Sequence, residues 1–532
     1  SYMAAGMHRT ASPLKYFAAL SVCPGIRRGE NPVDGKPVKK KFKMFDAVLA
    51  SVCIVMTIEA SAPAAKMGNS QFFWWGFLIL TFFLPYGLIS AELGTAYQGQ
   101  GGIYEWVRKA YGIRWGSRTA CYYWLNFPVW VSSIVLLFTD VLISTFHLPI
   151  GTFGGLAIQL LLIWLVAFLS CFRISDSKWI LNLAAVFKAI IMLALGCLGF
   201  YMALTKGAAN SFSPQSFLPS FDSQGLSYVI VILFDLMGFE VITTYTEDMP
   251  NPEKQLPLAI KLGGVLIVFF YILAAFGISV AIPTDQLSAS TGVMESFRIL
   301  LHQTDSVLIS LVAVMFLYAL FANLISWSLG VNSVIKSAAQ DHCLPEFLAV
   351  ESKKTGMPLG ASVINAVISS AIVILGAIVP NTDVFWQFFA MNMIILLLSY
   401  IMIFPSFLKL RKIDADRPRP YRIKGGTIKL KFIAYMPMSL ILLSLVFTVM
   451  PFHLSEAELS SKLPLLIGSG LVILISEYIS YRSLKSEKIR TGGKGRSADE
   501  KIISLSPKYG EKLGRKHNVT NCNCPGRQCI GK

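Results

Sequence analysis

Long apolar segments, separated by short polar loops, run through almost the whole chain. About 20 apolar residues cross the hydrocarbon core of a bilayer as a helix, and each segment approaches or exceeds that length. The third and fourth segments run together, so hydropathy leaves the boundary between them open. The pattern predicts an all-α polytopic membrane protein with twelve transmembrane helices, at residues 45–67, 72–94, 117–145, 149–172, 178–204, 226–246, 258–282, 304–337, 359–379, 383–408, 431–451 and 463–482.

The first and sixth segments differ from the others because polar and helix-breaking residues interrupt them. Glu59 and Pro63 lie inside the first, and Asp235, Gly238 and Glu240 lie inside the sixth. A carboxylate at membrane depth is costly and normally lines a cavity enclosed by protein, while proline and glycine weaken the helix around them. Two broken helices five segments apart predict a transporter with a five-plus-five inverted repeat, here followed by two extra helices. The alternative interpretation is a pair of kinked packing helices with buried, protonated acids.

The segments divide the chain into a transporter domain between two tails. We expect a cytoplasmic N-terminal tail at 1–44, a twelve-helix domain at 45–482 and a basic, flexible cytoplasmic tail at 483–532. Within the domain, the first repeat is predicted at about 45–204, the second at about 226–408 and the extra helices at 431–482.

Composition and charge agree with a membrane location. Hydrophobic residues make up 54% of the 532 residues and charged residues 14%, against about 25% charged in soluble domains. The net charge of +17 is concentrated in loops such as 36–43 and 409–431, whereas the intervening loops at 205–224 and 453–462 carry few Lys or Arg. This positive-inside distribution predicts cytoplasmic termini in a cell membrane, expected to be a bacterial inner membrane, and argues against a nucleic-acid partner. The loop at 409–431 is expected to meet anionic lipid headgroups.

Side chains that would indicate catalysis or metal binding are not grouped along the sequence. There is no H-E-x-x-H or paired-histidine spacing, no phosphate-binding loop ending in Gly-Lys, and no nucleophile–base pattern. Cys522, Cys524 and Cys529 lie near His517, but their spacing matches no standard zinc site. We therefore expect neither an enzyme nor a resident metal or cofactor.

An ordered set of short motifs, spread over about residues 41–481, carries a family resemblance. The motifs are AELG at 91–94, GGIYEWV at 101–107, MGFE at 237–240, EDMPNP at 247–252, SW at 326–327 and AAQD at 338–341. In this order they resemble the amino acid–polyamine–organocation transporters, and within them the glutamate/γ-aminobutyrate antiporter group. The resemblance implies a secondary amino acid transporter, expected to be an antiporter that exchanges an amino acid for an amine or a second amino acid by alternating access. A proton-coupled amino acid or polyamine symporter is the alternative, and a substrate sensor or channel on the same scaffold is the alternative from another class.

The resemblance also implies where the substrate binds. In this family the first and sixth helices unwind at the membrane midplane and hold a small-molecule amino acid or amine. Trp327 stands where the antiporter group has an aromatic gate, although a packing tryptophan explains it equally well. The protein is expected to work in the lipid bilayer as a monomer or homodimer. By position, the implied substrate-binding residues are Ile58, Glu59, Ala60, Ser61, Phe234, Asp235, Leu236, Met237 and Gly238.

The chain departs from the family pattern at its two breaks. A Gly-Ser-Gly-like sequence is absent from the first, where Glu59 stands, and relatives more often have a small or neutral residue at the position of Asp235, with an aromatic in place of Leu236. Two additional carboxylates favour a cationic substrate, such as a basic amino acid, a diamine or another amine, because an isolated buried anion is costly. The alternative is that one of the acids carries a coupling proton.

Lys188 and Glu240 are the candidates for proton coupling. Lys188 lies ten residues after Lys178, roughly 15 Å further along a helix, which is too deep for snorkelling alone. The sequence KAIIM at 188–192 is similar to that of sodium-independent relatives, in which a fifth-helix lysine takes the place of a sodium ion. An interhelical salt bridge is the alternative role for Lys188.

Overall fold

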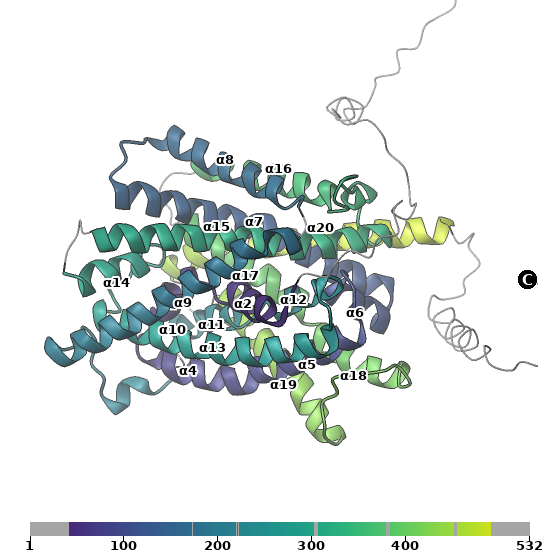
Figure 1. Cartoon of the computed structure of the whole chain (residues 1–532), viewed down its shortest axis with the longest axis horizontal. Coiled ribbons are helices and arrows are strands. Elements are labelled where there is room, and N and C mark those ends of the chain that lie inside the picture. Colours follow the sequence, from purple (N-terminus) through teal and green to yellow (C-terminus); the bar gives the residue numbers. More distant parts are fainter. Residues whose placement is uncertain are drawn as a thin grey trace, which may run out of the picture.

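The computed structural model describes residues 42–490, apart from 173, 220, 222, 303–306, 379–383 and 452–454, and this part of the chain is helical without strands (Figure 1). The expected tails therefore fall mostly outside the described residues, as do Cys522, Cys524, Cys529 and His517. Twelve helices in the described part are long and apolar enough to cross a membrane. The predicted all-α fold with twelve spans is confirmed, and each predicted segment overlaps its helix.

Among the first six spans, the third to fifth are single continuous helices, whereas the first, second and sixth are interrupted. Their bounds are α2 (Met44–Val55), η2 (Ile58–Ala60) and α3 (Ser61–Ala65) for the first, α4 (Ser70–Leu78), η3 (Ile79–Phe83) and α5 (Leu84–Ala96) for the second, α7 (Ile113–Phe146), α8 (Thr152–Leu169) and α9 (Ile174–Thr205) for the third to fifth, and α10 (Ser223–Ser227), α11 (Val229–Asp235) and α12 (Phe239–Thr243) for the sixth.

The second six spans contain one further interrupted helix, the tenth. The bounds are α13 (Pro252–Ala281), α15 (Val307–Gln340), α16 (Leu359–Ile378), α17 (Val384–Tyr400) with α18 (Ile403–Ile413), α19 (Thr427–Val449) and α20 (Glu456–Arg490). Short 3₁₀ turns lie in the connections at η4 (Pro214–Phe217), η5 (Thr246–Asp248) and η6 (Glu346–Ala349).

The boundary that hydropathy left open lies at His147, between the third and fourth spans. His147 adopts a left-handed conformation with φ 48°, and the N–H of Leu148 donates to the carbonyl of Ile143 at 3.2 Å. A left-handed residue ends a helix by turning the chain away from its axis, and Pro149 then prevents the helix from resuming directly.

Two short helices that hydropathy did not predict lie at opposite ends of the bundle (Figure 1). Helix α6 (Gly102–Tyr111) follows the second span, and α14 (Gly292–Leu300) follows the seventh. Their apolar residues pack on the bundle while charged residues face outward, which is typical of helices at a membrane–water boundary. Equivalent helices five spans apart and at opposite ends of the molecule are the arrangement that an inverted repeat produces.

The bundle contains two groups of tightly packed helices. Helix α7 packs against α17 and α20, while α13 packs against α9 and α2. Arg118 on α7 also forms two hydrogen bonds with the carboxylate of Glu477 on α20, at 2.5 and 2.6 Å. Two-point arginine–carboxylate pairs fix orientation as well as distance, so the twelfth span is held against the third.

Candidate substrate site

The first and sixth spans are both interrupted near their middle. Helix α2 ends at Val55, and the next two residues are extended, with ψ 103° at Met56 and ψ 92° at Thr57. In the sixth span α11 ends at Asp235 and the chain resumes as α12 after Gly238, whose φ of 121° lies in a region that side chains rarely allow. The predicted breaks are therefore present.

Pro63 is not where the first span unwinds. It lies in the first turn of α3, where a backbone N–H has no partner within the helix and proline costs little. The extended residues precede Glu59, so Pro63 follows the break instead of forming it.

The break leaves four successive carbonyls without helical donors: those of the last three residues of α2 and that of the next residue, Met56. Side chains from three other spans supply them: Lys188 on α9, Tyr271 on α13 and Trp327 on α15. Lys188 Nζ donates to the carbonyls of Cys53 (2.6 Å) and Met56, Trp327 Nε1 donates to that of Ile54 (3.0 Å), and the hydroxyl of Tyr271 donates to that of Val55 (3.1 Å). Each carbonyl in this run of four therefore has a protein donor.

Lys188 occupies the position of a cation bound to backbone oxygens. Its side chain is 1% exposed, and an ammonium group offers three donors. Among the described residues its hydrogen bonds go to carbonyls of the first span and not to a carboxylate, which favours the structural-cation role over the interhelical salt bridge. The proton-coupling role of Lys188 stays a prediction.

Asp235 closes the gap between the two breaks. Its Oδ1 accepts a hydrogen bond from Thr57 Oγ1 at 2.5 Å, and the N–H of Thr57 donates to the hydroxyl of Tyr271 at 2.8 Å. Asp235 is fully buried, and its Oδ2 has no hydrogen-bond partner among the described residues. A buried carboxylate oxygen with an open acceptor position is suited to receive a donor from a ligand.

Glu59 lies at the same break and contacts the eighth span. Its Oε1 accepts from Asn323 Nδ2 at 3.2 Å. Both carboxylates are at most 3% exposed. Within the described part of the chain, Asn323 Oδ1 and Ser61 Oγ have no hydrogen-bond partner either.

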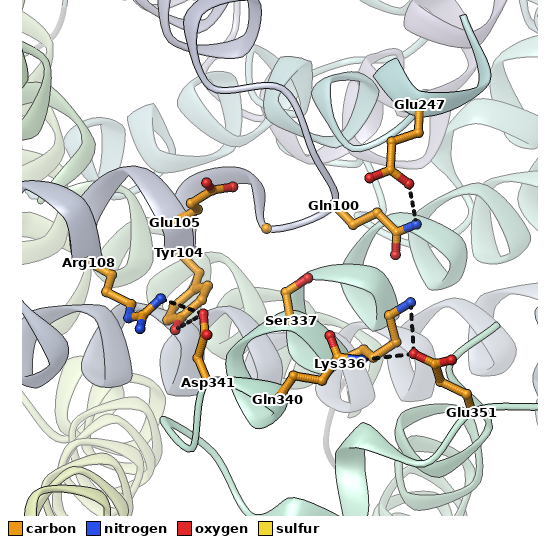
Figure 2. A pocket seen from close by; sticks show the side chains of 11 residues that line it. Gln100, Tyr104, Glu105, Arg108, Glu247, Lys336, Ser337, Gln340, Asp341 and Glu351 are labelled. Carbon is orange, nitrogen blue, oxygen red and sulfur yellow. Dashed lines mark hydrogen bonds and ion pairs between the residues drawn. The ribbon is translucent and has the colours of Figure 1, made fainter. Parts of the chain in front are cut away.

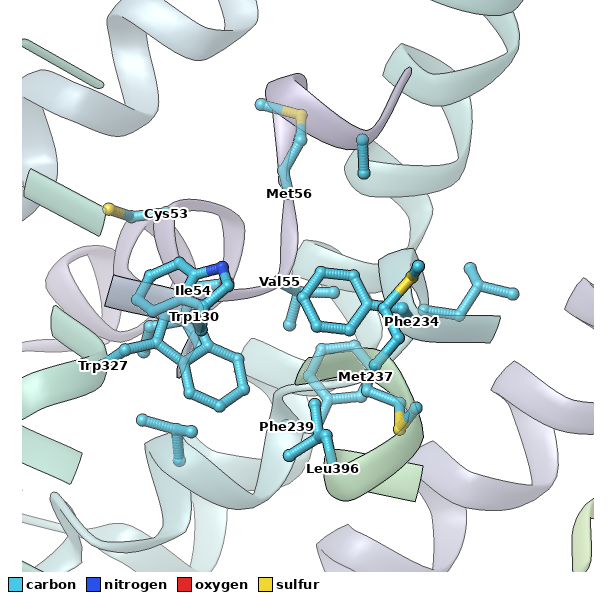
Figure 3. Close-up of a cluster of buried hydrophobic side chains, with 14 of the residues drawn as sticks. Cys53, Ile54, Val55, Met56, Trp130, Phe234, Met237, Phe239, Trp327 and Leu396 are labelled. Atoms are coloured by element: carbon cyan, nitrogen blue, oxygen red, sulfur yellow. The ribbon is translucent and has the colours of Figure 1, made fainter. Parts of the chain in front are cut away.

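An apolar cluster borders these polar groups (Figure 3). The rings of Trp327 and Trp130 lie 5.9 Å apart, and Phe234 meets Phe389 edge to face at 5.3 Å. Figure 3 shows the two tryptophans on one side of Val55 and Phe234 on the other. The predicted site residues Ile58, Ala60, Leu236 and Met237 are also buried at the breaks. The gate role of Trp327 stays a prediction, while its contact with the carbonyl of Ile54 gives it a definite packing role.

Glu240 lies in a different environment from Glu59 and Asp235. Its carboxylate accepts hydrogen bonds from Tyr86 on the second span and from Tyr123 on the third, the latter at 3.0 Å. The hydroxyl of Tyr86 also accepts from the N–H groups of Gly238 (3.3 Å) and Glu240 (3.2 Å). This arrangement holds the start of α12 in place, and the proton-coupling role of Glu240 stays a prediction.

Sequence analysis missed Thr57, Tyr271 and Asn323. Each is a neutral polar residue within an apolar span, and only Thr57 adjoins a residue that the sequence analysis singled out. The available signal was the polar atom itself, because a buried hydroxyl or amide needs a partner.

A cavity of about 550 Å³ opens at the end of the bundle that carries α6 (Figure 2). Figure 2 shows two ion pairs among the side chains that line it, Arg108 with Asp341 at 2.6 Å and Lys336 with Glu351 at 3.5 Å, and a hydrogen bond from the amide of Gln100 to Glu247 at 2.7 Å. Burial raises the pKa of Tyr104, which therefore remains a donor to Asp341 at 2.9 Å.

Part of the basic loop at 409–431 folds against the same end of the protein. Glu92, fully buried at the end of α5, accepts two hydrogen bonds from Arg411, one of them at 2.7 Å, and a third from the N–H of Ile423 at 2.7 Å. Arg417 donates to the carbonyl of Ala96 at 2.6 Å. These arginines bind protein groups, so the expected lipid contact is left to the remaining basic residues of the loop.

The family model described as amino acid permease matches residues 42–475. The chain belongs to the amino acid permease family. This membership, together with the twelve spans, makes it a multi-pass membrane transporter, and the resemblance found in the sequence is confirmed.

Curated relatives carry transport names. A probable agmatine/putrescine antiporter of Lactococcus lactis is 46% identical over 447 residues, which cover 84% of this chain and 96% of that protein. A glutamate/gamma-aminobutyrate antiporter of the same species is 23% identical over 464 residues, covering 83% and 90%. A vacuolar cationic amino acid transporter 4 of Arabidopsis thaliana is 25% identical over 297 residues, covering 53% and 49%.

Proposed function

We propose that this transporter exchanges agmatine for putrescine, or closely similar organic cations, by alternating access. The observation that carries the proposal is the pair of buried carboxylates, Glu59 and Asp235, one at each break. The relative with 46% identity, whose name includes both compounds, supports it.

The charge of the site favours such substrates. Agmatine carries a guanidinium and an amine, and putrescine carries two amines, so both are cationic at each end at neutral pH. Buried carboxylates require compensating charge, and a cation with two charged ends matches carboxylates that lie on two different spans. Exchange of one dication for another also leaves the charge of the site unchanged after each cycle.

The substrate-binding residues belong to this proposal as a set. The cation lies between the first and sixth spans, with Asp235 and Glu59 as its counter-ions. The side chain of Phe234 and the backbone of Leu236, Met237 and Gly238 border it. Residues Ile58, Ala60 and Ser61 complete the opposite wall, and Trp327 closes the apolar side.

The positive-inside distribution supports an orientation with both termini in the cytoplasm. In this orientation the cavity near α6 is the inner vestibule, and the protein lies in a bacterial cell membrane as a monomer or homodimer. The domain limits proposed from the sequence, with tails at 1–44 and 483–532 around a transporter domain at 45–482, fit this orientation.

Reconstitution into proteoliposomes tests the proposed exchange. Uptake of labelled agmatine is measured with internal putrescine, with internal γ-aminobutyrate and with no internal substrate. We expect rapid, saturable uptake only with putrescine inside. Uptake into empty vesicles driven by a proton gradient would instead indicate symport, and non-saturable flux would indicate a channel. Absence of agmatine uptake, with glutamate taken up against γ-aminobutyrate, would overturn the proposal.

A further inference from the structure

Three buried acceptor atoms near the two breaks have no donor among the described residues. They are Asp235 Oδ2, Asn323 Oδ1 and Ser61 Oγ, and each side chain is at most 3% exposed. An unpaired buried acceptor is unfavourable and rare in native proteins. Asp235 and Ser61 lie at the two breaks and Asn323 contacts Glu59 beside them, so the three atoms indicate a ligand that brings hydrogen-bond donors.

The backbone donors of the first break are largely used by the protein itself. The N–H of Thr57 donates to Tyr271, that of Ala60 to the carbonyl of Thr57 (3.2 Å) and that of Ser61 to the carbonyl of Ile58. The protein thus uses backbone donors at this break that the carboxylate of an amino acid would otherwise require.

The sixth break shows the same pattern. The N–H of Gly238 donates to the hydroxyl of Tyr86 at 3.3 Å, and that of Met237 donates to the carbonyl of Phe234 at 3.0 Å. Asn323 donates its amide to Glu59, which leaves its oxygen, an acceptor, as the open atom. The open polar atoms at the site are therefore mainly acceptors, two of which belong to Asp235 and Asn323.

We propose that this surplus of acceptors makes the transporter select amines against the amino acids from which decarboxylation produces them. Agmatine and putrescine present only donors, whereas arginine and ornithine add an α-carboxylate that the buried carboxylates of Glu59 and Asp235 would repel. The inference rests on the proposed function and identifies the α-carboxylate as the group that the site rejects. Glu59 is the specificity-determining residue, because its carboxylate stands buried at the first break, where it accepts a hydrogen bond from Asn323.

The expected discrimination is large. When the wrong ligand leaves buried polar groups of an enzyme site unpaired, the enzyme discriminates against that ligand by a factor of about 10⁴ or more. Repulsion between a ligand carboxylate and buried carboxylates of the site is at least as unfavourable. We expect the inhibition constant of arginine against labelled agmatine uptake to be at least about a hundredfold higher than that of unlabelled agmatine. The inhibition constant of ornithine should exceed that of putrescine by the same factor.

Competition in putrescine-loaded proteoliposomes tests this inference. Inhibition of labelled agmatine uptake is measured for the pairs agmatine and arginine, and putrescine and ornithine. In Glu59→Gln, the amide provides a donor and removes a repelling charge, so we expect the arginine-to-agmatine ratio of inhibition constants to fall about tenfold or more. Glu105→Gln is the control, because Glu105 lies on α6 in a partly exposed pair with Lys109, away from both breaks in the chain, and it should keep the wild-type ratio.

The outcomes separate the two proposals. Wild-type exchange of agmatine for putrescine with arginine competing within about threefold of agmatine would overturn the inference and leave the proposed function standing. Failure of wild-type exchange itself would overturn the proposed function. If Glu59→Gln does not transport, equilibrium binding in detergent, followed by the fluorescence of Trp327 and Trp130, gives the same ratio. An unchanged ratio in that variant would also overturn the role of Glu59.

Discussion

The ammonium group of Lys188 lies 2.6 Å from the carbonyl oxygen of Cys53 and also contacts that of Met56. Lys188→Met keeps the length of the side chain but leaves two buried carbonyls unpaired, at a cost of about 1–3 kcal/mol each. We expect a clear loss of thermal stability in detergent, measured by unfolding with a fluorescent thiol probe. Lys336→Met is the control, because Lys336 pairs at 3.5 Å with a Glu351 side chain that is 40% exposed. Equal melting temperatures for the two variants would contradict the structural role of Lys188.

Sodium should have no effect on exchange. The carbonyl oxygens that a sodium ion would need are already bound by the ammonium group of Lys188. We expect equal initial rates of agmatine–putrescine exchange in sodium and potassium media of the same ionic strength. A rate that falls severalfold without sodium would show that the cation site lies elsewhere.

Gly238 should not tolerate a side chain. Its φ is +121°, and an added Cβ would lie 3.3 Å from atoms of Ile54, Val55 and Trp327. Backbone strain alone costs about 1–3 kcal/mol, and the three contacts are tighter than normal packing. Gly238→Ala is therefore expected to lower both stability and exchange rate.

Gly207→Ala provides the matched control for Gly238. This glycine also has a positive φ, of +88°, but nothing lies within 4 Å of its Cβ position. Its substitution introduces strain without crowding at the break, so the difference between the two melting temperatures isolates the packing contribution. A smaller effect at Gly238 than at Gly207 would be inconsistent with the close packing of the two breaks.

Asp235 should matter more for transport than the hydroxyl that binds it. Asp235→Asn removes the counter-ion of a buried cation, an effect of about 2 kcal/mol or more, or roughly 30-fold in apparent affinity. Thr57→Val removes the donor to Oδ1 and the contact of the Thr57 hydroxyl with that of Tyr271 at 3.1 Å, but leaves the charge in place. The Michaelis constant for agmatine should therefore rise more in Asp235→Asn than in Thr57→Val. A larger rise in Thr57→Val would mean that Asp235 is not the counter-ion.

Glu92 should be essential for the fold of the loop at 409–431. Removal of one partner from a buried ion pair costs about 3–5 kcal/mol, and Glu92→Ala would strand both Arg411 and the N–H of Ile423. We expect lower thermal stability and faster proteolysis within the loop. Glu105→Ala, which breaks a partly exposed pair with Lys109, should change stability by less than about 1 kcal/mol. Similar cleavage patterns for both variants would argue against the role of Glu92 as an anchor.

The fold was largely predictable because membrane insertion imposes a length and a hydropathy on every span. The positions of α6 and α14 were not, since a helix of nine or ten residues with a charged face resembles an ordinary loop in a hydropathy profile. The end of the third span at His147 was also hidden, because it depends on one left-handed residue within an apolar run.

The acids of the candidate site were predictable because a carboxylate within an apolar span is conspicuous. Tyr271 and Asn323 were not, since tyrosine and asparagine are tolerated in spans for many reasons. Tyr271 reaches a break 214 positions earlier in the chain, and that contact follows from how α13 packs on α2. The sequence pattern thus located the buried charges. The neutral groups that bind them could be identified only once the packing of the spans was known.

The pairing of Arg118 with Glu477 has a practical consequence for following the transport cycle. Because this two-point contact joins the twelfth span to the third, the two helices are expected to move as one body. A spectroscopic label on an exposed position of the twelfth span, such as Leu474, would lie outside the set of substrate-binding residues. Such a label would nevertheless report the displacement of the third span, without a probe having to be placed among the residues that bind the substrate.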